Sequence, residues 1–342
     1  MNAQPLISVE GLRTSFRTSR GEVQAVRGVD LHVKPGEVLG IVGESGSGKS
    51  VTCMSLLRLL KRQGRIVGGS AMFEGRDLLA MGEGELSDVR GNEIAVIFQD
   101  PMSSLNPTLT VGEQVIETIL RHRKASRAQA RARAIELFDL VRIPAAKDRI
   151  DAYPHEFSGG MRQRAMIAMA LACDPKLLIA DEPTTALDVT IQSQILNLLR
   201  DIQGRLGMSV ILITHDLGVI AEVCDRVAVM YGGLIMEEAR VEDLFANSRH
   251  PYTQGLLASI PDLREGTRQR LQPIPGSPPD MSDPPPGCPF APRCAHARLQ
   301  CDAALPPIYG AADTALLAHG QTSRCWLMHP DAPSVAEVNG DV

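Results

Sequence analysis

The strongest candidate for chemistry is the stretch GESGSGKS, residues 43–50, which has the pattern GxxxxGK[ST]. It lies between an apolar run, VLGIV, and a helix-like run, which is the strand-to-helix setting that the pattern requires. Glycines let the backbone curl so that successive N–H groups face one anion, and the helix N-terminus adds partial positive charge. We expect Lys49 to reach β- and γ-phosphate oxygens and Ser50 to bind Mg²⁺. The candidate nucleotide-binding residues here are Gly43, Glu44, Ser45, Gly46, Ser47, Gly48, Lys49, Ser50 and Val51.

Two adjacent acids supply the other groups that phosphate chemistry needs. The apolar run LLIA ends in Asp181-Glu182, 132 residues after Lys49. Asp181 would bind Mg²⁺, directly or through water, and Glu182 would face the attacking water. An apolar run ending in two acids is a weak signal alone, but together with the glycine-rich loop it predicts a nucleotide-hydrolysing site.

Length and composition narrow the class of protein. The chain has 342 residues, 44% of them hydrophobic and 22% charged, which is typical of a globular protein of about two domains. Its net charge of −5 disfavours a protein whose main task is to hold nucleic acid. We see no apolar run long enough to cross a bilayer and no secretory signal, so we expect a cytoplasmic location.

The elements that would position these residues alternate between strands and helices. From residue 176 to 229, buried strand-like runs alternate with helical runs, which indicates a doubly wound α/β sheet. Residues 121–140 have helical periodicity and are predicted to form one helix, with the basic run 121–133 on its solvated face. Residues 273–292 are rich in proline, so we expect neither helix nor central strand there. We place a domain boundary near residue 262.

Four of the seven cysteines lie in the C-terminal part of the chain. Cys288, Cys294, Cys301 and Cys325 crowd together in a protein expected to be kept reduced, which favours metal binding over disulfides. Five, six and 23 residues separate successive members, without a CxxC knuckle, so an ordinary zinc site is less persuasive. An iron–sulfur cluster, zinc and free thiols remain as alternatives.

At this point the chain resembles the ATP-binding cassette (ABC) ATPases. Residues 158–164, SGGMRQR, are similar to the family signature LSGGQxQR, with Met161 where the family usually has Gln. The resemblance covers about residues 6–262 and implies a P-loop ABC core: a RecA-like sheet, an antiparallel β-subdomain and a helical signature subdomain at about 100–172. It implies ATP and Mg²⁺ as ligands, with each ATP held between the P-loop of one chain and the signature of a second chain, packed head to tail.

The resemblance also implies roles for residues elsewhere in the chain. Gln99 corresponds to the glutamine that senses Mg²⁺, His215 to the switch histidine at the γ-phosphate, and Phe16 to the aromatic that stacks on adenine. Glu182, His215 and Gln99 would be catalytic, and Ser50, Gln99 and Asp181 would hold Mg²⁺. The remaining nucleotide contacts would come from Ser158, Gly159, Gly160 and Asp188.

A narrower resemblance is to the dipeptide/oligopeptide permease ATPases. It rests on FQDPMSSLNP (98–107), the SGGMRQR signature, HPYT (250–253) and CPFAPRC (288–294). It implies an importer ATPase at the cytoplasmic face of the membrane, with a second, different ATPase, two transmembrane permease subunits and an extracytoplasmic peptide-binding protein as partners. The extension, residues 263–342, resembles a [4Fe–4S] binding region, for which four thiolates are the right number. Because the ATP motifs all lie before residue 216, we expect ATP binding not to depend on this tail.

Three alternatives stay open beside the peptide importer. An importer of nickel or another small solute shares much of the pattern. A soluble ABC ATPase acting on nucleic acid or ribosomes would usually have two cassettes or a long coiled coil, which this sequence lacks. A non-hydrolysing regulatory cassette conflicts with the intact Glu182 and His215.

Overall fold

The computed structural model describes residues 4–19, 21–100, 104–185, 188–259, 273–310, 312–314, 318 and 320–330. The chain divides into two compact units. Unit 1 consists of Met1–Ser8, His32–Val38 and Met72–Thr214, and unit 2 of Val9–Leu31, Leu39–Ala71 and His215–Val342. The boundary predicted near residue 262 lies outside the described residues.

Unit 1 contains parallel strands and a group of helices. Its strands β6 (Ile94–Ile97), β7 (Leu177–Asp181) and β8 (Ser209–Thr214) pair in parallel in the order β8-β7-β6. All residues of β7 and β8 are buried, as expected for strands covered on both faces. The helices of this unit are α2 (Glu83–Val89), α4 (Val111–His122), α5 (Arg127–Leu140), α6 (Ala146–Arg149), α7 (Gly159–Ala170) and α8 (Val189–Leu206).

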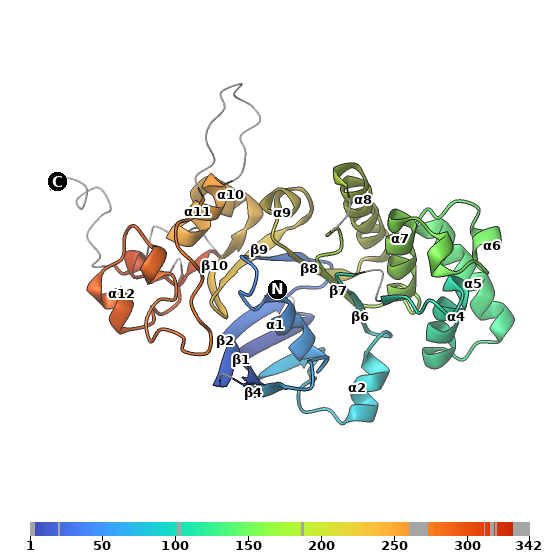
Figure 1. The fold of residues 1–342 in the computed structure, drawn as a ribbon, viewed down its shortest axis with the longest axis horizontal. Helices are drawn as coiled ribbons and strands as arrows, with labels where there is room; N and C mark the ends of the chain where they lie inside the picture. Colours follow the sequence, from blue (N-terminus) through green and yellow to red (C-terminus); the bar gives the residue numbers. More distant parts are fainter. Residues whose placement is uncertain are drawn as a thin grey trace, which may run out of the picture. The chain divides into compact units, whose positions relative to one another are not determined.

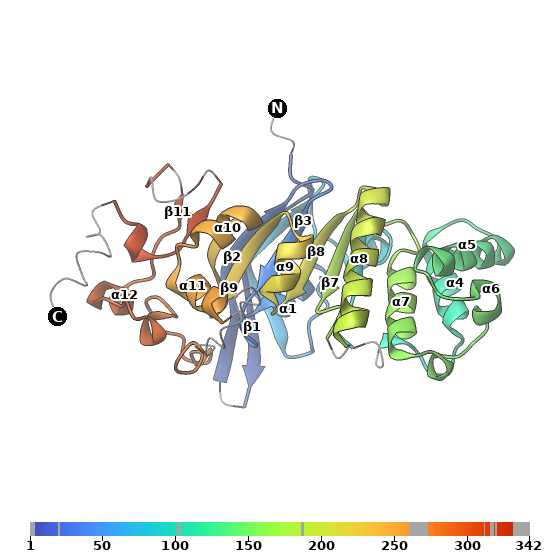
Figure 2. The ribbon, with the colours of Figure 1, turned by 90° about the horizontal axis from the view of Figure 1, so that it is seen from above.

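Within unit 1, the helices α4 to α7 pack against one another, as Figure 1 shows. They fall in the range predicted for the helical subdomain. The long helix α8 runs beside α7, which Figure 2 shows from above. The first turns of the two helices are in close contact, since a Cβ on Gly160 would lie 3.1 Å from the Ile191 side chain.

The prediction of one helix over residues 121–140 is wrong. Helix α4 ends at His122, and α5 begins only at Arg127. Ser126 caps α5 by accepting a hydrogen bond from the Gln129 N–H, and the Gln129 side chain accepts one from the Ser126 N–H. This reciprocal pair satisfies two donors that a continuous helix would have used, so the chain breaks there. On the solvated face, Arg121, Arg127 and Arg131 form ion pairs with acids.

Unit 2 contains two sheets. In one, β2 (Gly21–Val33), β1 (Ile7–Thr18) and β4 (Gly64–Phe73) lie side by side. The last two residues of β4, Met72 and Phe73, belong to unit 1, where they pair with β5 (Arg76–Asp77). In the other, the order is β11 (Tyr309–Gly310), β12 (Thr322–Ser323), β10 (Leu234–Arg240), β9 (Arg226–Tyr231) and β3 (Val38–Val42). The pairing of β3 with β9 is parallel, whereas β10 pairs antiparallel with both β9 and β12. The mixture of parallel strands and helices confirms the predicted α/β class.

The helices of unit 2 are short. They are α1 (Lys49–Leu56), α9 (Leu217–Val223), α10 (Val241–Asn247), α11 (Pro251–Ala258) and α12 (Leu299–Ala303), with short 3-10 turns at Ala291–Arg293 and Trp326–Met328. As expected from their prolines, residues 273–290 form neither helix nor strand. Throughout the described part of the chain, every helix is too short or too polar to span a bilayer.

The C-terminal segment, by which we mean the described residues from 273 to 330, shares the hydrophobic core of unit 2. Phe290 and Ala291 are buried in one cluster with residues of β9, β10 and α11. The Phe290 ring lies 5.5 Å from the Tyr231 ring and 5.3 Å from the Tyr252 ring, centre to centre. The segment therefore contributes aromatic side chains to the same core that supports β3 and the loop after it.

We predict that Phe290→Ala destabilises the protein by about 3–5 kcal/mol, because it removes a large side chain that packs against two buried tyrosines. Urea unfolding monitored by the fluorescence of Trp326, the one tryptophan of the chain, measures the change. Phe245→Ala is the matched control, since Phe245 on α10 is 37% exposed. Equal effects of the two substitutions would contradict the shared core.

Candidate functional site

The loop of residues 43–50, hereafter the P-loop, connects β3 to α1. A Cβ on Gly43 would lie 2.1 Å from the Met230 carbonyl oxygen, and a Cβ on Gly48 would lie 2.5 Å from the Ala25 carbonyl oxygen. Gly48 also has a φ of 104°, a left-handed conformation that side chains rarely allow. Only glycine fits at these two positions, so the spacing of the motif is imposed by the packing around the loop.

The polar groups of the P-loop are arranged to bind an anion. Lys49 is buried, and its Nζ donates to the carbonyl oxygens of Gly43 (2.7 Å) and Glu44 (3.0 Å), which holds the ammonium over the loop. The Ser47 hydroxyl is buried and, among the described residues, has no hydrogen-bond partner. Ser45 and Gly46 are exposed at the tip. A buried donor without a partner and a fixed cation next to it fit a phosphate group.

The other predicted nucleotide contacts of unit 2 lie on separate elements. Phe16 is half-buried on β1, and its ring approaches the start of β4, since a Cβ on Gly64 would lie 2.8 Å from the Phe16 Cε1 atom. Its predicted role in stacking on adenine stays a prediction. His215 is exposed directly before α9, whose N-terminus is capped by Asp216.

Unit 1 brings the predicted residues Gln99 and Glu182 together. Glu182 follows β7, where Asp181 is the buried last residue. The Glu182 carboxylate accepts a hydrogen bond from Gln99 Nε2 at 3.0 Å. Its backbone has a φ of 45°, and its N–H donates to the Ile213 carbonyl oxygen at 2.9 Å. Such left-handed conformations of residues other than glycine cost about 1–3 kcal/mol and are found mostly at functional sites.

Thr185 is a site residue that the sequence analysis missed. Its hydroxyl donates to the same Glu182 oxygen, Oε2, at 2.8 Å. Gln99 follows β6 and Thr185 lies in the turn after β7, so two separate segments of unit 1 hold the Glu182 carboxylate. The signal that could have found it is a hydroxyl three residues after the predicted catalytic acid.

The signature residues and Asp188 are helix caps in unit 1. Ser158 is the N-cap of α7, which begins with Gly159 and Gly160, and its hydroxyl accepts from the Met161 N–H at 3.4 Å. Asp188 is the N-cap of α8 and accepts from the Ile191 N–H at 2.9 Å. The first backbone N–H groups of α7 have no partner inside the helix, and the helix dipole gives this end a partial positive charge. The prediction of a second anion site requires these two properties. The P-loop, Phe16 and His215 belong to unit 2. The other residues predicted to contact ATP or Mg²⁺ belong to unit 1.

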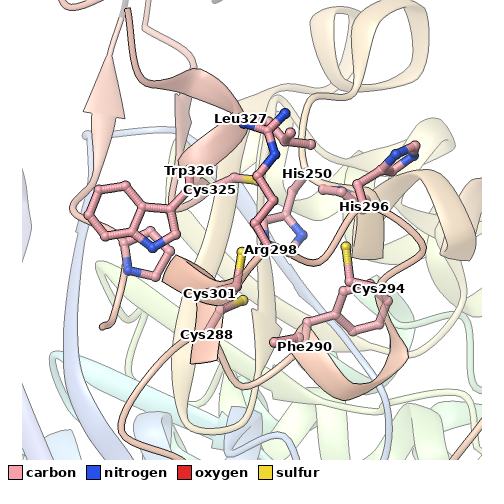
Figure 3. A pocket seen from close by; sticks show the side chains of 13 residues that line it. His250, Cys288, Phe290, Cys294, His296, Arg298, Cys301, Cys325, Trp326 and Leu327 are labelled. Atoms are coloured by element: carbon pink, nitrogen blue, oxygen red, sulfur yellow. The ribbon is translucent and has the colours of Figure 1, made fainter. Parts of the chain in front are cut away.

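The four C-terminal cysteines line one pocket of unit 2. His250, Phe290, Arg298 and Trp326 line it as well, and Figure 3 shows the four cysteine side chains around a common space. The Cys288 N–H donates to the Cys301 carbonyl oxygen at 2.7 Å, which joins two of the four segments. A Cβ on Gly287 would lie 2.0 Å from that same oxygen, so this close crossing needs glycine.

Burial controls the protonation of the side chains in this pocket. Burial, with the neighbouring thiols adding to it, raises the pKa of Cys288 to about 11 and that of Cys325 to about 12. Burial also lowers the pKa of His250 to about 3, so the imidazole is neutral. The His250 Nδ1 atom accepts from the Tyr252 N–H at 3.0 Å, so the ring proton is on Nε2.

The space that the four cysteines line is small. Its cavity volume is about 20 Å³, which is room for little more than one water molecule. Within the described ranges, no set of three or more His, Cys, Asp or Glu side chains is placed to hold a metal ion. The donors are of the right kind and number for a cluster. The predicted [4Fe–4S] cluster is therefore not supported by the structure and stays a proposal.

The comparisons with known proteins agree with this geometry. Residues 26–185 match the ABC transporter family, and residues 236–301 match the C-terminal region of oligopeptide/dipeptide transporters. The chain is 53% identical to the oligopeptide transport ATP-binding protein OppD of Bacillus subtilis, over 96% of this chain and 91% of that protein. The chain belongs to the ABC transporter family. It falls within the oligopeptide/dipeptide group of that family.

Further relatives extend the match to the whole chain and to the fold. The dipeptide transport ATP-binding protein DppD of Bacillus subtilis is 49% identical over 99% of both chains. A dimeric ATP-binding cassette solved with ADP and phosphate has a TM-score of 0.62 and 27% identity, covering 69% of this chain and 98% of its own. The cbiO1 protein of Clostridium perfringens, part of an ABC transporter complex, has a TM-score of 0.60 and 30% identity over 71% of this chain and 91% of its own. The predicted ABC ATPase fold is confirmed.

We predict that Thr185→Ala lowers the kcat of ATP hydrolysis roughly fivefold with little change in KM, because the Glu182 carboxylate loses the hydrogen bond from the Thr185 hydroxyl. The measurement is steady-state ATPase activity of the complex purified through this chain. Thr185→Ser is the control, because it keeps the hydroxyl and should retain most of the activity. An unchanged kcat in the alanine variant would show that the hydroxyl does not hold the carboxylate in its working position.

Proposed function

We propose that this ABC ATPase is the ATP-hydrolysing subunit of an importer for dipeptides or oligopeptides. The observation that carries the proposal is that the similarity to peptide transport ATP-binding proteins covers the C-terminal segment as well as the ATPase core. Related cassettes of other transporters match only about 70% of the chain. The C-terminal segment is therefore the part that favours peptide as cargo.

The proposed mechanism uses the residues of both units. The P-loop N–H groups and Lys49 bind the phosphates, and Ser50 and Asp181 would hold the Mg²⁺ that neutralises the phosphate charge when bound. Glu182 orients and polarises the attacking water, and Gln99 holds the Glu182 carboxylate through the hydrogen bond described above. His215 would contact the γ-phosphate.

The signature helix α7 supports a proposed dimer. One nucleotide needs one phosphate-binding loop, so a second anion site on the same chain implies a second chain that contributes the missing half. We propose a head-to-tail pair, with a different ATPase chain as partner, bound to two membrane permease subunits at the cytoplasmic face. An extracytoplasmic binding protein would deliver the peptide. Relatives in the solved structures form dimers of such cassettes.

For the C-terminal pocket we propose a thiolate-ligated metal centre, with a [4Fe–4S] cluster as its form. Four cysteines from separate segments line one space, and soft thiolate ligands select iron–sulfur clusters or zinc. Metal binding would release the protons that burial now favours on Cys288 and Cys325.

We predict that a strain lacking this chain loses uptake of labelled tripeptide and regains it with the wild-type gene. Lys49→Ala should not restore uptake, because the positive charge at the phosphates is lost.

Glu182→Gln should still bind ATP but lower kcat by at least about 100-fold, since the water is no longer activated. The measurements are peptide uptake, nickel uptake and ATPase activity. Loss of nickel uptake with normal peptide uptake would assign the chain to the nickel importers instead.

We predict about four irons with matching sulfide per chain in protein purified without oxygen, with a visible absorption band from sulfur-to-iron charge transfer. Cys294→Ser should remove both, while Cys224→Ser, a similarly half-buried cysteine outside the pocket, should retain them. Elemental analysis decides the identity of the metal. One zinc per chain would replace the cluster by a zinc site, and metal-free protein would exclude a metal centre.

A further inference from the structure

Arg293 joins the C-terminal segment to the P-loop. It lies in the 3-10 turn Ala291–Arg293, directly before Cys294, and its side chain is only 4% exposed. Its Nη1 donates to Glu44 Oε2 at 2.7 Å, and its Nη2 donates to Glu44 Oε1 at 3.0 Å. Two parallel charge-assisted hydrogen bonds of this kind fix both the position and the orientation of a carboxylate. The residues are 249 positions apart in the sequence.

The guanidinium is itself held by several groups of unit 2. Its Nε donates to the Pro275 carbonyl oxygen at 2.8 Å, and its Nη1 also donates to the Tyr231 hydroxyl at 3.0 Å. The guanidinium carbon lies 5.7 Å from the centre of the Tyr231 ring and 5.9 Å from that of the Phe290 ring, within the range of cation–π contacts. A lysine could not make the same planar set of contacts.

Glu44 is fixed through its backbone as well as its side chain. Its N–H donates to the Tyr252 hydroxyl at 2.9 Å, and its carbonyl oxygen accepts from Lys49 Nζ at 3.0 Å and from the Ser47 N–H at 3.2 Å. Any movement of Glu44 would therefore be transmitted to Lys49, the cation of the loop. We expected ATP binding not to depend on the tail, and no sequence pattern indicated this contact.

Arg293 also neutralises the negative charge of Glu44. Glu44 is part of the loop that must bind the phosphates of ATP, and an uncompensated carboxylate there would repel them. At about 4–6 Å, a charge of opposite sign strongly offsets such a repulsion when both groups are partly shielded from water. Arg293 supplies that charge from a nearly buried position.

We propose that Arg293 is a positioning residue of the ATP site: its guanidinium holds Glu44 in place and neutralises it, so that the C-terminal segment sets the affinity of the P-loop for Mg·ATP. This inference rests on the proposal that the P-loop binds ATP. It assigns to the segment a part in nucleotide binding, in addition to any metal that its cysteines hold.

The test is the Kd for Mg·ATP of the purified full chain, measured by isothermal titration calorimetry. Arg293→Met should weaken binding about tenfold, equivalent to about 1.4 kcal/mol, because the negative charge of Glu44 in the phosphate-binding loop is then uncompensated. Adding Glu44→Gln to Arg293→Met should restore most of the affinity, since the repelling charge is removed. A merely structural ion pair would not give this rescue, because the double variant would lack both partners.

Two controls separate the possible causes. Arg324→Met removes a second arginine of the same segment, whose side chain donates to the Ile235 and Pro306 carbonyl oxygens and, among the described residues, forms no hydrogen bond with the P-loop. It should leave the Kd within about twofold of the wild type. The fluorescence of Trp326 reports whether the segment stays folded in each variant.

The outcomes distinguish this inference from the proposed function. Normal Mg·ATP binding by Lys49→Ala would overturn the assignment of the P-loop itself. Loss of binding in Lys49→Ala with a normal Kd in Arg293→Met would overturn only the role of Arg293. Equal weakening by Arg293→Met and Arg324→Met, or a double variant that binds no better than Arg293→Met, would likewise show that Arg293 acts only through the folding of the segment.

Discussion

The backbone of the P-loop runs so close to its neighbouring strands that no side chain can stand between them. At Gly43 the neighbour is the last part of β9, and at Gly48 it is β2. The Ser47 carbonyl oxygen accepts from the Gly233 N–H at 3.0 Å, which fastens the loop to the turn after β9. The packing of unit 2 therefore stabilises the curled shape that phosphate binding requires. Everything else at the site depends on the shape of this loop.

The aromatic cluster of Tyr231, Tyr252 and Phe290 links that loop to the C-terminal segment. Tyr231 ends β9, Tyr252 lies in the first turn of α11, and Phe290 belongs to the segment itself. The two tyrosines present their rings to the core and their hydroxyl groups to Arg293 and to the P-loop. Because of burial, the pKa of each hydroxyl is raised, so both remain neutral hydrogen-bonding groups at physiological pH. One apolar cluster therefore supports both the phosphate loop and the cysteine pocket.

The features that could be predicted from the sequence are those that depend on residues close together in the chain. The P-loop, the strand ending in Asp181 and the capping residues Ser158 and Asp188 all depend on neighbours within a few positions. The family resemblance implied a role for Gln99 at the site, but its hydrogen bond to Glu182 was not predicted. The contact of Arg293 with Glu44 could not be predicted, since no local pattern relates two charges so distant in sequence. The break before α5 could have been predicted from the sequence, because Ser126 and Gln129 have the spacing of a capping box.

The C-terminal strands also protect the sheet of unit 2. Strand β10 pairs on one side with β9 and on the other with β12, where Glu237 faces Ser323 and Glu238 faces Thr322. The Gln321 side chain also donates to the buried carboxylate of Glu237 at 2.9 Å. If the chain were cut back to its ATPase core, β10 would become an unpaired edge with apolar neighbours at Leu234, Ile235 and Met236. Such edges recruit strands from other molecules, so a truncated cassette would tend to aggregate even with its nucleotide site intact.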